Sequence, residues 1–521
     1  MQDTMRHANR SILSGPLTPT DLGGVRIYLI GIGGCGMSGL ARMLASRGAI
    51  VCGSDKEDTE TVVALRSEGI EVGLEQDAGR IPPETGVVIA SAAVAPNHPE
   101  VVAAVGAGLP VLTYAEALGQ CMVGRTGVAV AGTHGKSTTV ALLGHALLVA
   151  GLDPTVVVGA VCKQLAKPGK SPTGFHLGAD SIPAGPLAGQ PGLLLAEACE
   201  FNRSFHRLCP KVACITSVEA DHLDVYGTLD AVVEAFAEFA QMLPADGGRL
   251  LIAHEGAHRR EVTGGVEAEV ETIGFAPMAD WHVTYDTAAR RVGLNHKGRH
   301  IANWVLRIPG EHMAMNSAMA ATLAIWLGAP AAKVAEAMDC FEGVDRRMQL
   351  LGEVTLRPQA LPLRIYDDYG HHPTEIDTTL RALRDFERPQ ERGGRLICIF
   401  QPHQHSRTRF LLEEFAQAFA QADIVIVPHI YFVRDSDIEK TRVSASDLVD
   451  RLRKRGIHAM HLYPFEAIVE QLDLLCRPGD LLVVMGAGPV WKIARDFMGR
   501  HTNVRAASRG IVQPAPRLAV P

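Results

Sequence analysis

One short segment carries the residue types that bind the phosphates of a nucleotide. It consists of Gly132, Thr133, His134, Gly135, Lys136, Ser137 and Thr138, between an apolar run and a predicted helix. Glycine lacks a Cβ atom, so its backbone can approach phosphate oxygens, and the N-terminus of the following helix favours negative charge. We expect Lys136 to bridge the β- and γ-phosphates of ATP and the Ser137 hydroxyl to bind Mg²⁺.

The segment departs from the usual phosphate-loop pattern at one position. Val130 stands where the pattern GxxxxGK, followed by serine or threonine, has its first glycine. The alternative interpretation is a glycine turn with a surface lysine. The buried strand before the segment and the helix after it favour the phosphate loop.

Acidic residues and a histidine follow two further apolar runs. Glu197 comes directly after a run that ends at Ala196, and Asp221 and His222 follow a run that ends at Thr216. Open α/β sheets bind ligands outside the carboxyl ends of their strands, and Mg²⁺ prefers one or two carboxylates completed by water. We therefore expect a magnesium site beside the phosphate loop, although either cluster alone fits a solvated loop equally well.

A second glycine-rich turn lies near the N-terminus. Gly31, Gly33 and Gly36 form a GxGxxG pattern after a predicted strand, and Asp55 ends the next strand. This pattern is typical of dinucleotide binding, with the acidic residue on a ribose hydroxyl. An NAD(P)-dependent oxidoreductase would explain this turn but not the phosphate loop. The two loops together favour a substrate linked to a nucleotide diphosphate, with ATP bound elsewhere.

Alternating strands and helices must position these loops. Such alternation predicts an α/β protein with parallel sheets covered on both faces. We expect strands at Arg26–Ile30, Ala49–Cys52, Gly86–Ala90, Pro110–Thr113, Gly127–Ala131, Gly192–Ala196, Val212–Thr216, Leu363–Asp367, Arg395–Phe400, Ile424–Pro428 and Leu481–Met485. The expected helices include Met37–Gly48, Thr138–Ala150, Ala314–Leu327 and Thr374–Asp385.

The order of these elements divides the chain into three domains. We expect them at residues 1–122, 123–345 and 346–498. The stretch Lys163–Pro191 is rich in proline, glycine and alanine, which indicates an insertion or a mobile loop. Residues 499–521 are predicted to form a disordered tail.

Composition limits the class of protein. The 521 residues carry a formal net charge of −7, which argues against non-specific binding to nucleic acid. The N-terminus lacks the apolar region of a signal peptide, and no run of roughly 18 or more apolar residues predicts a membrane helix. The ten cysteines lack CxxC pairs, which indicates free thiols in a reducing cytoplasm. We expect a cytoplasmic protein without nucleic-acid or membrane partners, as a monomer or weak homodimer.

A series of motifs occurs in an order that resembles the Mur ligases. They are GIGGCGMSG, AGTHGKST, the EACE and DHLD clusters, DDYGHHPTEI from Asp367 to Ile376, and FQPHQHSRT from Phe400 to Thr408. The resemblance implies a Rossmann-like N-terminal domain for a UDP-sugar, a P-loop-type central domain for ATP and Mg²⁺, and a Rossmann-like C-terminal domain for an amino acid. It implies a ligase of peptidoglycan precursor synthesis that joins L-alanine to the lactyl carboxylate of UDP-N-acetylmuramate through an acyl phosphate.

The resemblance also implies roles for individual residues. The UDP-sugar is expected against Gly33, Gly34, Gly36, Met37, Ser38, Asp55 and Ser91. Magnesium is expected at Ser137, Glu197 and His222, and ATP at the phosphate loop with Asn316, Arg346, Arg347 and Asp367. The amino acid is expected at Tyr369, His371, His403 and Arg407. Catalysis is expected to depend on Lys136, Glu197 and His222, with His371 as a candidate base for the amine.

The chain departs from the pattern of this family at several positions. Met313 replaces an asparagine usual near the adenine, and Cys199 replaces an acidic residue in the EADE run. Gln404 replaces the arginine of FQPHRxSRT, and a glutamine cannot bind a carboxylate in a charged fork. We therefore expect Arg407 alone to hold the carboxylate of the amino acid.

Related ligases offer other interpretations. A ligase that recycles a tripeptide onto the same sugar shares the HHPT motif but usually lacks FQPHxxSRT and the GIGGxGM turn. A folylpolyglutamate-type ligase shares the central loop but not the N-terminal turn. The histidine pairs lack the partners of a recognisable zinc pattern, so polar contacts are the better interpretation. We expect domain three to close over domain two about a hinge near Gly343–Gly352.

Overall fold

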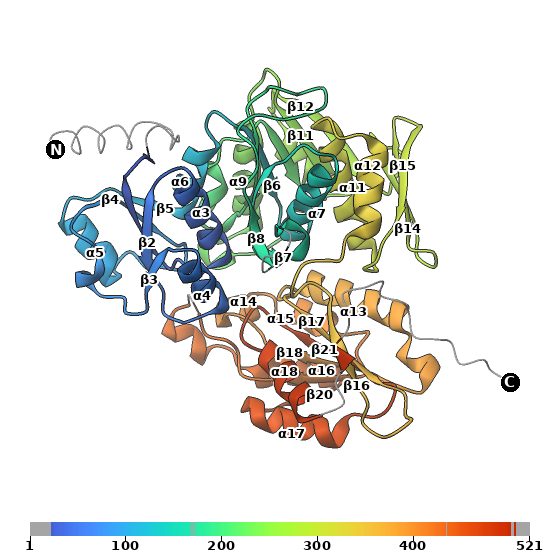
Figure 1. The fold of residues 1–521 in the computed structure, drawn as a ribbon. Helices are drawn as coiled ribbons and strands as arrows, with labels where there is room; N and C mark the ends of the chain where they lie inside the picture. The colour runs from blue at the N-terminus through green and yellow to red at the C-terminus, as the bar shows by residue number, and fades with distance from the viewer. Residues whose placement is uncertain (1–21, 168, 170–171, 434, 502–504, 507–521) are drawn as a thin grey trace.

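The structure is a computed structural model, and it describes residues 22–167, 169, 172–433, 435–501 and 505–506. Its strands form three sheets, and each sheet with its helices makes one α/β domain. In Figure 1 the N-terminal domain, in blue, lies beside the middle domain, in green and yellow, and the C-terminal domain, in orange and red, lies below both. The expected three-domain α/β architecture is confirmed.

The first domain contains a parallel five-stranded sheet in the order β3-β2-β1-β4-β5. Central β1 pairs with β2 on one side and with β4 on the other. The strands are β1 (Arg26–Ile30), β2 (Ile50–Ser54), β3 (Glu71–Gly73), β4 (Thr85–Ala90) and β5 (Val111–Thr113). The helices are α3 (Cys35–Ser46), α4 (Glu60–Ser67), α5 (Pro99–Gly106) and α6 (Tyr114–Met122).

The middle domain contains a ten-stranded sheet in the order β15-β14-β13-β12-β11-β10-β6-β9-β7-β8. Its parallel part comprises β6 (Thr126–Ala131), β7 (Thr155–Cys162), β9 (Leu193–Ala198), β10 (Val212–Ile215), β11 (Arg249–Ala253), β12 (Glu269–Gly274) and β13 (Trp281–Asp286). Antiparallel strands close its two edges: β8 (Thr173–His176), β14 (Arg291–His296) and β15 (Arg299–Val305). The longer helices are α7 (Lys136–Val149), α9 (Leu229–Gln241), α11 (Glu311–Trp326) and α12 (Ala331–Cys340).

The C-terminal domain contains a seven-stranded sheet in the order β20-β19-β18-β21-β17-β16-β22. Its parallel strands are β17 (Leu363–Asp368), β18 (Leu396–Phe400), β19 (Ile424–Val427), β20 (His458–His461) and β21 (Leu481–Met485). The antiparallel pair β16 (Gln349–Val354) and β22 (Arg505–Ala506) forms one edge. The helices are α13 (Pro373–Glu387), α14 (His405–Phe410), α15 (Leu412–Gln417), α16 (Ala445–Lys454), α17 (Phe465–Leu475) and α18 (Trp491–Arg500).

The phosphate loop is held by the most buried elements of the middle domain. All but the first residue of β6 are buried, and buried side chains cover most of α7 and α11. Helices that are apolar all round lie inside a core rather than on its surface. These helices pack on each other and share one hydrophobic cluster with β6. The start of α7, where the loop ends, therefore has little freedom to move.

Every strand expected from the sequence is present, with ends shifted by at most two residues. The sequence pattern did not predict β7. The interpretation of Lys163–Pro191 as an insertion or mobile loop was wrong in part, because Thr173–His176 forms the edge strand β8 against β7. The predicted tail lies mostly outside the described residues, although α18 continues to Arg500 and β22 pairs with β16.

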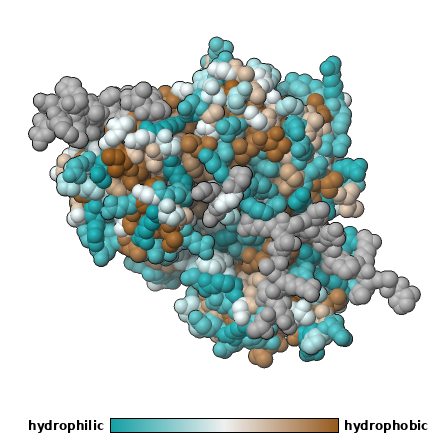
Figure 2. All heavy atoms as spheres, viewed as in Figure 1, coloured by the Kyte–Doolittle hydropathy of each residue, from teal (hydrophilic) through white to brown (hydrophobic). Residues whose placement is uncertain are grey.

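Figure 2 shows hydrophobic and hydrophilic side chains interspersed over one face of the molecule. The exposed large hydrophobic residues include Val102 and Val105 on α5. Among the residues that the structure describes, no helix is both long and apolar enough to cross a membrane.

Candidate active site

The phosphate loop connects β6 to α7 in a conformation that needs its glycines. Gly132 has a φ of 132° and Gly135 a φ of 78°, both in the region that side chains rarely adopt. A Cβ atom on Gly135 would also lie 2.5 Å from the Oδ1 atom of Asn316, so a larger residue would push the asparagine away. The two glycines therefore permit a tight loop that leads directly into the N-terminus of α7.

The Lys136 ammonium lies inside this loop rather than in solvent. It donates to the carbonyl oxygens of Gly132 and Thr133, and its Nζ atom lies 2.9 Å from Oε2 of Glu200. Burial alone would lower the pKa of Lys136, but the Glu200 carboxylate outweighs burial and holds that pKa above its usual value. Lys136 is therefore a fixed positive charge at the loop.

A cavity of about 380 Å³ lies beside Lys136, where the three domains meet. Cys35, at the start of α3, lines it from the first domain. From the middle domain come the phosphate loop with Glu197, Glu200, Asp221 and His222, and from the C-terminal domain come Arg346, Arg347, Tyr369 and His371. Expected residues from separate motifs thus converge on one space.

Three side chains in this cavity form a group suited to a cation. Ligand atoms of Glu200, Asp221 and His222 all lie within 4.8 Å of one another. Burial lowers the pKa of His222 even though Asp221 and Glu200 lie beside it, so the ring is neutral and can offer a lone pair. Glu197 lines the same cavity, but its carboxylate accepts a hydrogen bond of 2.6 Å from the Gly159 amide. Sequence reasoning had chosen Glu197 and did not assign Glu200.

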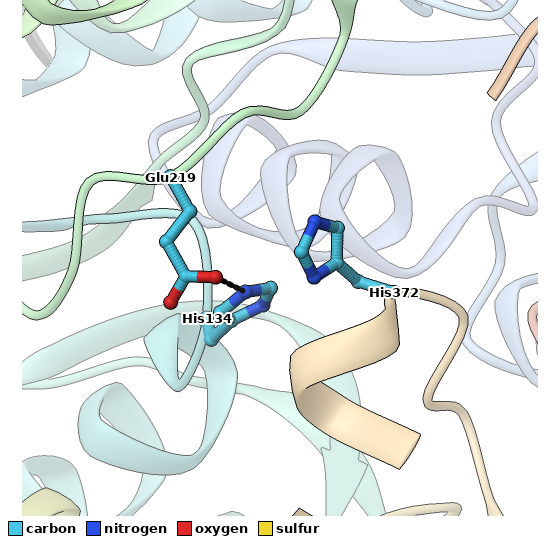
Figure 3. Close-up of side chains that lie close together, drawn as sticks. All are labelled: His134, Glu219 and His372. Atoms are coloured by element: carbon cyan, nitrogen blue, oxygen red, sulfur yellow. Dashed lines mark ion pairs between the residues drawn. The ribbon is translucent and has the colours of Figure 1, made fainter. Parts of the chain in front are cut away.

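A second group of titratable side chains joins the phosphate loop to the C-terminal domain (Figure 3). His134 lies between two carboxylates, 3.5 Å from Glu219 and 3.4 Å from Glu375. Burial would lower the pKa of His134, but these carboxylates raise it to about 9. His372 lies beside His134, and its two ring nitrogens contact the Thr374 amide and the Ala220 carbonyl oxygen. This group is therefore an ion-pair network between domains.

The His134 network gives the contact between domains a pH dependence. A histidine whose pKa is higher in the folded state stabilises that state. The stabilisation is full below the unfolded pKa of 6.5 and is lost as the pH rises through about 9. We expect wild type to melt at a higher temperature than His134→Gln at pH 6, with the difference disappearing by pH 10. Melting curves across this range test the prediction. His300 is exposed, so His300→Gln serves as the control. A difference in melting temperature between wild type and His134→Gln that stays constant at every pH would contradict the prediction.

A smaller cavity of about 230 Å³ adjoins the loop on the side of α11. Asn316 lines it, as do Met313 and His312 from the same helix. Burial lowers the pKa of His312 to about 4, so the ring is neutral. The cavity is largely apolar and opens beside Gly135, which suits a flat base attached to phosphates in the loop.

The two aspartates that end β17 have different surroundings. Asp367 is buried and accepts a hydrogen bond of 3.2 Å from Nε of Arg346. Asp368, which sequence reasoning did not assign, lines the smaller cavity, and burial raises its pKa to about 6. Successive residues of a strand face opposite sides, so only one of the pair can face this cavity. Arg347 lines both cavities.

The four residues expected to bind the amino acid lie together. The rings of Tyr369 and His371 are 5.4 Å apart, and those of His371 and His403 are 5.6 Å apart. Arg407 donates to Nδ1 of His403 at 3.2 Å. Burial and the charge of Arg407 lower the pKa of His371 to about 3. The Nδ1 atom of His371 lies 3.1 Å from the Tyr369 carbonyl oxygen, so the neutral ring keeps its lone pair on Nε2.

The glycine turn of the first domain follows β1 at the carboxyl edge of its sheet. The Gly33 amide donates to Asp55 at 2.7 Å, and a Cβ on Gly33 would lie 2.9 Å from the same carboxylate. A Cβ on Gly36 would lie 2.8 Å from the Tyr114 hydroxyl. Ser91 follows β4 and packs beside the turn, while Met37 and Ser38 are buried in α3. The residues expected to bind a UDP-sugar thus lie together at the carboxyl edge of the first sheet.

Three family models match successive parts of the chain. They are described as the Mur ligase family catalytic domain at residues 26–126, the Mur ligase middle domain at 130–324, and the Mur ligase glutamate ligase domain at 346–488. The chain therefore belongs to the Mur ligase family.

Individual relatives show which Mur ligases the chain is similar to. A UDP-N-acetylmuramate–L-alanine ligase from Agathobacter rectalis is 35% identical over 479 residues, covering 91% of this chain and 98% of the relative. The crystal structure of a UDP-N-acetylmuramate–alanine ligase from Thermotoga maritima matches with a TM-score of 0.72 at 25% identity, covering 91% of this chain and 98% of that one. A murein peptide ligase from Psychrobacter arcticus shares the fold, with a TM-score of 0.69, 22% identity and coverage of 93% of this chain and 100% of that one.

Proposed function

We propose that this protein joins L-alanine to the lactyl carboxylate of UDP-N-acetylmuramate, with hydrolysis of ATP, in peptidoglycan precursor synthesis. The convergence of the phosphate loop, an acidic cluster, and Tyr369 and His371 of the expected amino-acid site around one cavity carries this proposal. A ligase of this kind must bring a triphosphate, an acid and an amine to one point. The family uses ATP, and an amide bond is the product.

ATP is proposed to bind with its phosphates on residues 132–138 and its base in the smaller cavity beside Asn316. Lys136 and Arg347 stabilise the phosphates, while Arg346 and Asp367 hold each other at the hinge. The donor set of His222, Glu200 and Asp221, with Glu197 and Ser137 nearby, fits a hard divalent cation such as Mg²⁺. Bound there, Mg²⁺ would neutralise charge on the transferred phosphoryl group.

The proposed reaction has two steps. The lactyl carboxylate attacks the γ-phosphorus of ATP, the bond from that phosphorus to the β–γ bridging oxygen breaks, and ADP leaves as the acyl phosphate forms. The neutral amine of L-alanine then attacks the acyl carbon, the amide bond forms, and inorganic phosphate leaves. Lys136 stabilises the charge that develops on the phosphoryl oxygens. Domain closure excludes water, which would otherwise hydrolyse the acyl phosphate.

The role of His371 in this reaction follows from its pKa of about 3. So weak a base cannot hold the proton of the amine at neutral pH. The lone pair on Nε2 can still accept a hydrogen bond from the amine and orient it towards the acyl carbon. We propose that His371 orients the amine, and that Tyr369 and His403 hold the ring in place.

The UDP-sugar is proposed to lie along the glycine turn of the first domain. Gly33, Gly34, Gly36, Met37, Ser38, Asp55 and Ser91 are the proposed contacts. Because Cys35 already lines the central cavity, a sugar bound at this turn would point its lactyl group towards Lys136. We further propose domain boundaries at residues 122/123 and 345/346, and a cytoplasmic monomer or weak homodimer.

A phosphate-release assay tests the proposed function. Phosphate should appear only when ATP, UDP-N-acetylmuramate and an amino acid are all present. Competition among L-alanine, glycine, L-serine and the recycling tripeptide identifies the acceptor. Preference for the tripeptide would replace the alanine ligase by the recycling ligase, and release of phosphate without the UDP-sugar would refute both.

Gln404 provides a separate prediction on affinity for the amino acid. It caps α14 with a φ of 68° and only 2% of its surface exposed. We expect Gln404→Arg to lower the KM for L-alanine a few-fold, because a guanidinium can bind a carboxylate with charge. Steady-state kinetics at saturating ATP measure this effect, with Gln404→Met as the uncharged control of similar length. An unchanged or higher KM would show that the carboxylate is held elsewhere.

A further inference from the structure

The guanidinium of Arg407 already binds a carboxylate in this structure. Its Nε and Nη2 atoms each lie 2.9 Å from Oδ1 of Asp221, and its Nη1 atom donates to His403. The two side chains are 5% and 8% exposed. Contacts this short are those of a charge-assisted pair, which here joins the middle domain to the C-terminal domain.

We propose that Asp221 takes the place of the carboxylate of the incoming amino acid and releases Arg407 when a divalent cation binds beside Glu200 and His222. This inference rests on the proposed function, in which Arg407 holds the carboxylate of L-alanine. It makes Asp221 a positioning residue that couples two binding sites.

The first argument is that one donor edge of Arg407 is already occupied by a carboxylate. Nε and Nη2 form the edge that binds a carboxylate in a fork, and Asp221 occupies it. Nη1 faces His403. A second carboxylate on the same edge would meet the negative charge of Asp221. L-alanine therefore cannot bind Arg407 in this way until Asp221 moves.

The second argument is that Asp221 has another partner available to its other oxygen. Its Oδ2 atom lies 3.7 Å from Nε2 of His222, and the same Nε2 lies 3.8 Å from Glu200. These three side chains form the group suited to a cation. A divalent ion attracts a carboxylate more strongly than a single guanidinium charge does. Asp221 can thus exchange Arg407 for the cation.

The consequence is a coupling between cation and amino acid. If the cation frees Arg407, then the cation raises the affinity for L-alanine, and L-alanine must raise the affinity for the cation by the same factor. An ordinary metal site without this exchange would leave the two affinities independent.

Equilibrium binding to the whole protein tests the coupling without turnover. Calorimetry measures the Kd of L-alanine in Mn²⁺ and in EDTA, and electron paramagnetic resonance of free Mn²⁺ measures its Kd with and without L-alanine. We expect about a tenfold tighter Kd in each measurement, corresponding to about 1.4 kcal/mol of coupling. Equal affinities for L-alanine in Mn²⁺ and in EDTA would overturn the proposal.

Two variants locate the coupling. Asp221→Asn keeps the shape and a hydrogen bond for Arg407 but loses the charge, so L-alanine should bind the metal-free variant more tightly than metal-free wild type, with less than about twofold coupling. Asp224→Asn changes an exposed residue of the short helix Leu223–Tyr226 that follows, and it should keep the wild-type coupling. Tenfold coupling in Asp221→Asn would overturn the proposal. The wild-type Mn²⁺ measurement decides the matter if this variant does not fold.

The phosphate-release assay separates this inference from the proposed function. Ligation of L-alanine by wild type, without any coupling of affinities, would refute only the role of Asp221. Absence of ligation would refute the proposed function.

Discussion

Lys136→Ala is expected to lower kcat by about a thousandfold while changing the affinity for UDP-N-acetylmuramate by less than about twofold. The ammonium lies within the loop that is proposed to hold the β- and γ-phosphates, 2.9 Å from Glu200. Removing it takes away the charge that offsets the charge on the transferred phosphoryl group. The glycine turn that is proposed to bind the UDP-sugar belongs to the first domain, so its contacts with that sugar do not involve the Lys136 ammonium. Phosphate release and calorimetry with the UDP-sugar measure the two quantities.

Loss of folding must be distinguished from loss of chemistry in this variant. Glu200 is 3% exposed, and a buried carboxylate left without its partner destabilises a protein by about 3 kcal/mol. The double variant Lys136→Ala, Glu200→Gln removes both charges and should regain much of the melting temperature but none of the activity. Near-normal turnover of Lys136→Ala would remove the lysine from its proposed role.

Local patterns predicted the parts of the fold that local physics determines. Apolar runs located the parallel strands, because strands buried on both faces read as continuous hydrophobic sequence. The glycines at positions 132 and 135 predicted the loop, since both have the positive φ that favours glycine. The edge strand Thr173–His176 was missed, because a short strand between glycine- and proline-rich segments has no strong pattern.

Contacts between domains could not be predicted in this way. His134 and Glu219 both lie in the middle domain, and the docking of α13 on that domain brings Glu375 to His134. The pairing of Arg407 with Asp221 has the same origin. The choice between Asp367 and Asp368 depends on which face of β17 meets the loop, and the motif contains both residues without indicating their direction.

Arg407→Lys is expected to raise the KM for L-alanine by about 10- to 100-fold, with a smaller change in kcat at saturation. Each nitrogen atom of the guanidinium has a partner. Nε and Nη2 contact the Asp221 carboxylate, and Nη1 donates to His403. A lysine keeps the charge but presents a single nitrogen, so it cannot bind a carboxylate and His403 in the same geometry. Steady-state kinetics with varied L-alanine and saturating ATP measure the change.

Arg409→Lys supplies the matched control for this prediction. It lies on the same helix, α14, and pairs with Glu439 at 2.8 Å on a more exposed surface. Its KM for L-alanine should stay within about twofold of wild type, because a lysine keeps the charge that pairs with Glu439 and Glu439 lies outside the cavity. An equal rise in both variants would mean that distortion of α14, rather than loss of the fork, weakens binding. An unchanged KM in Arg407→Lys would mean that another group holds the carboxylate.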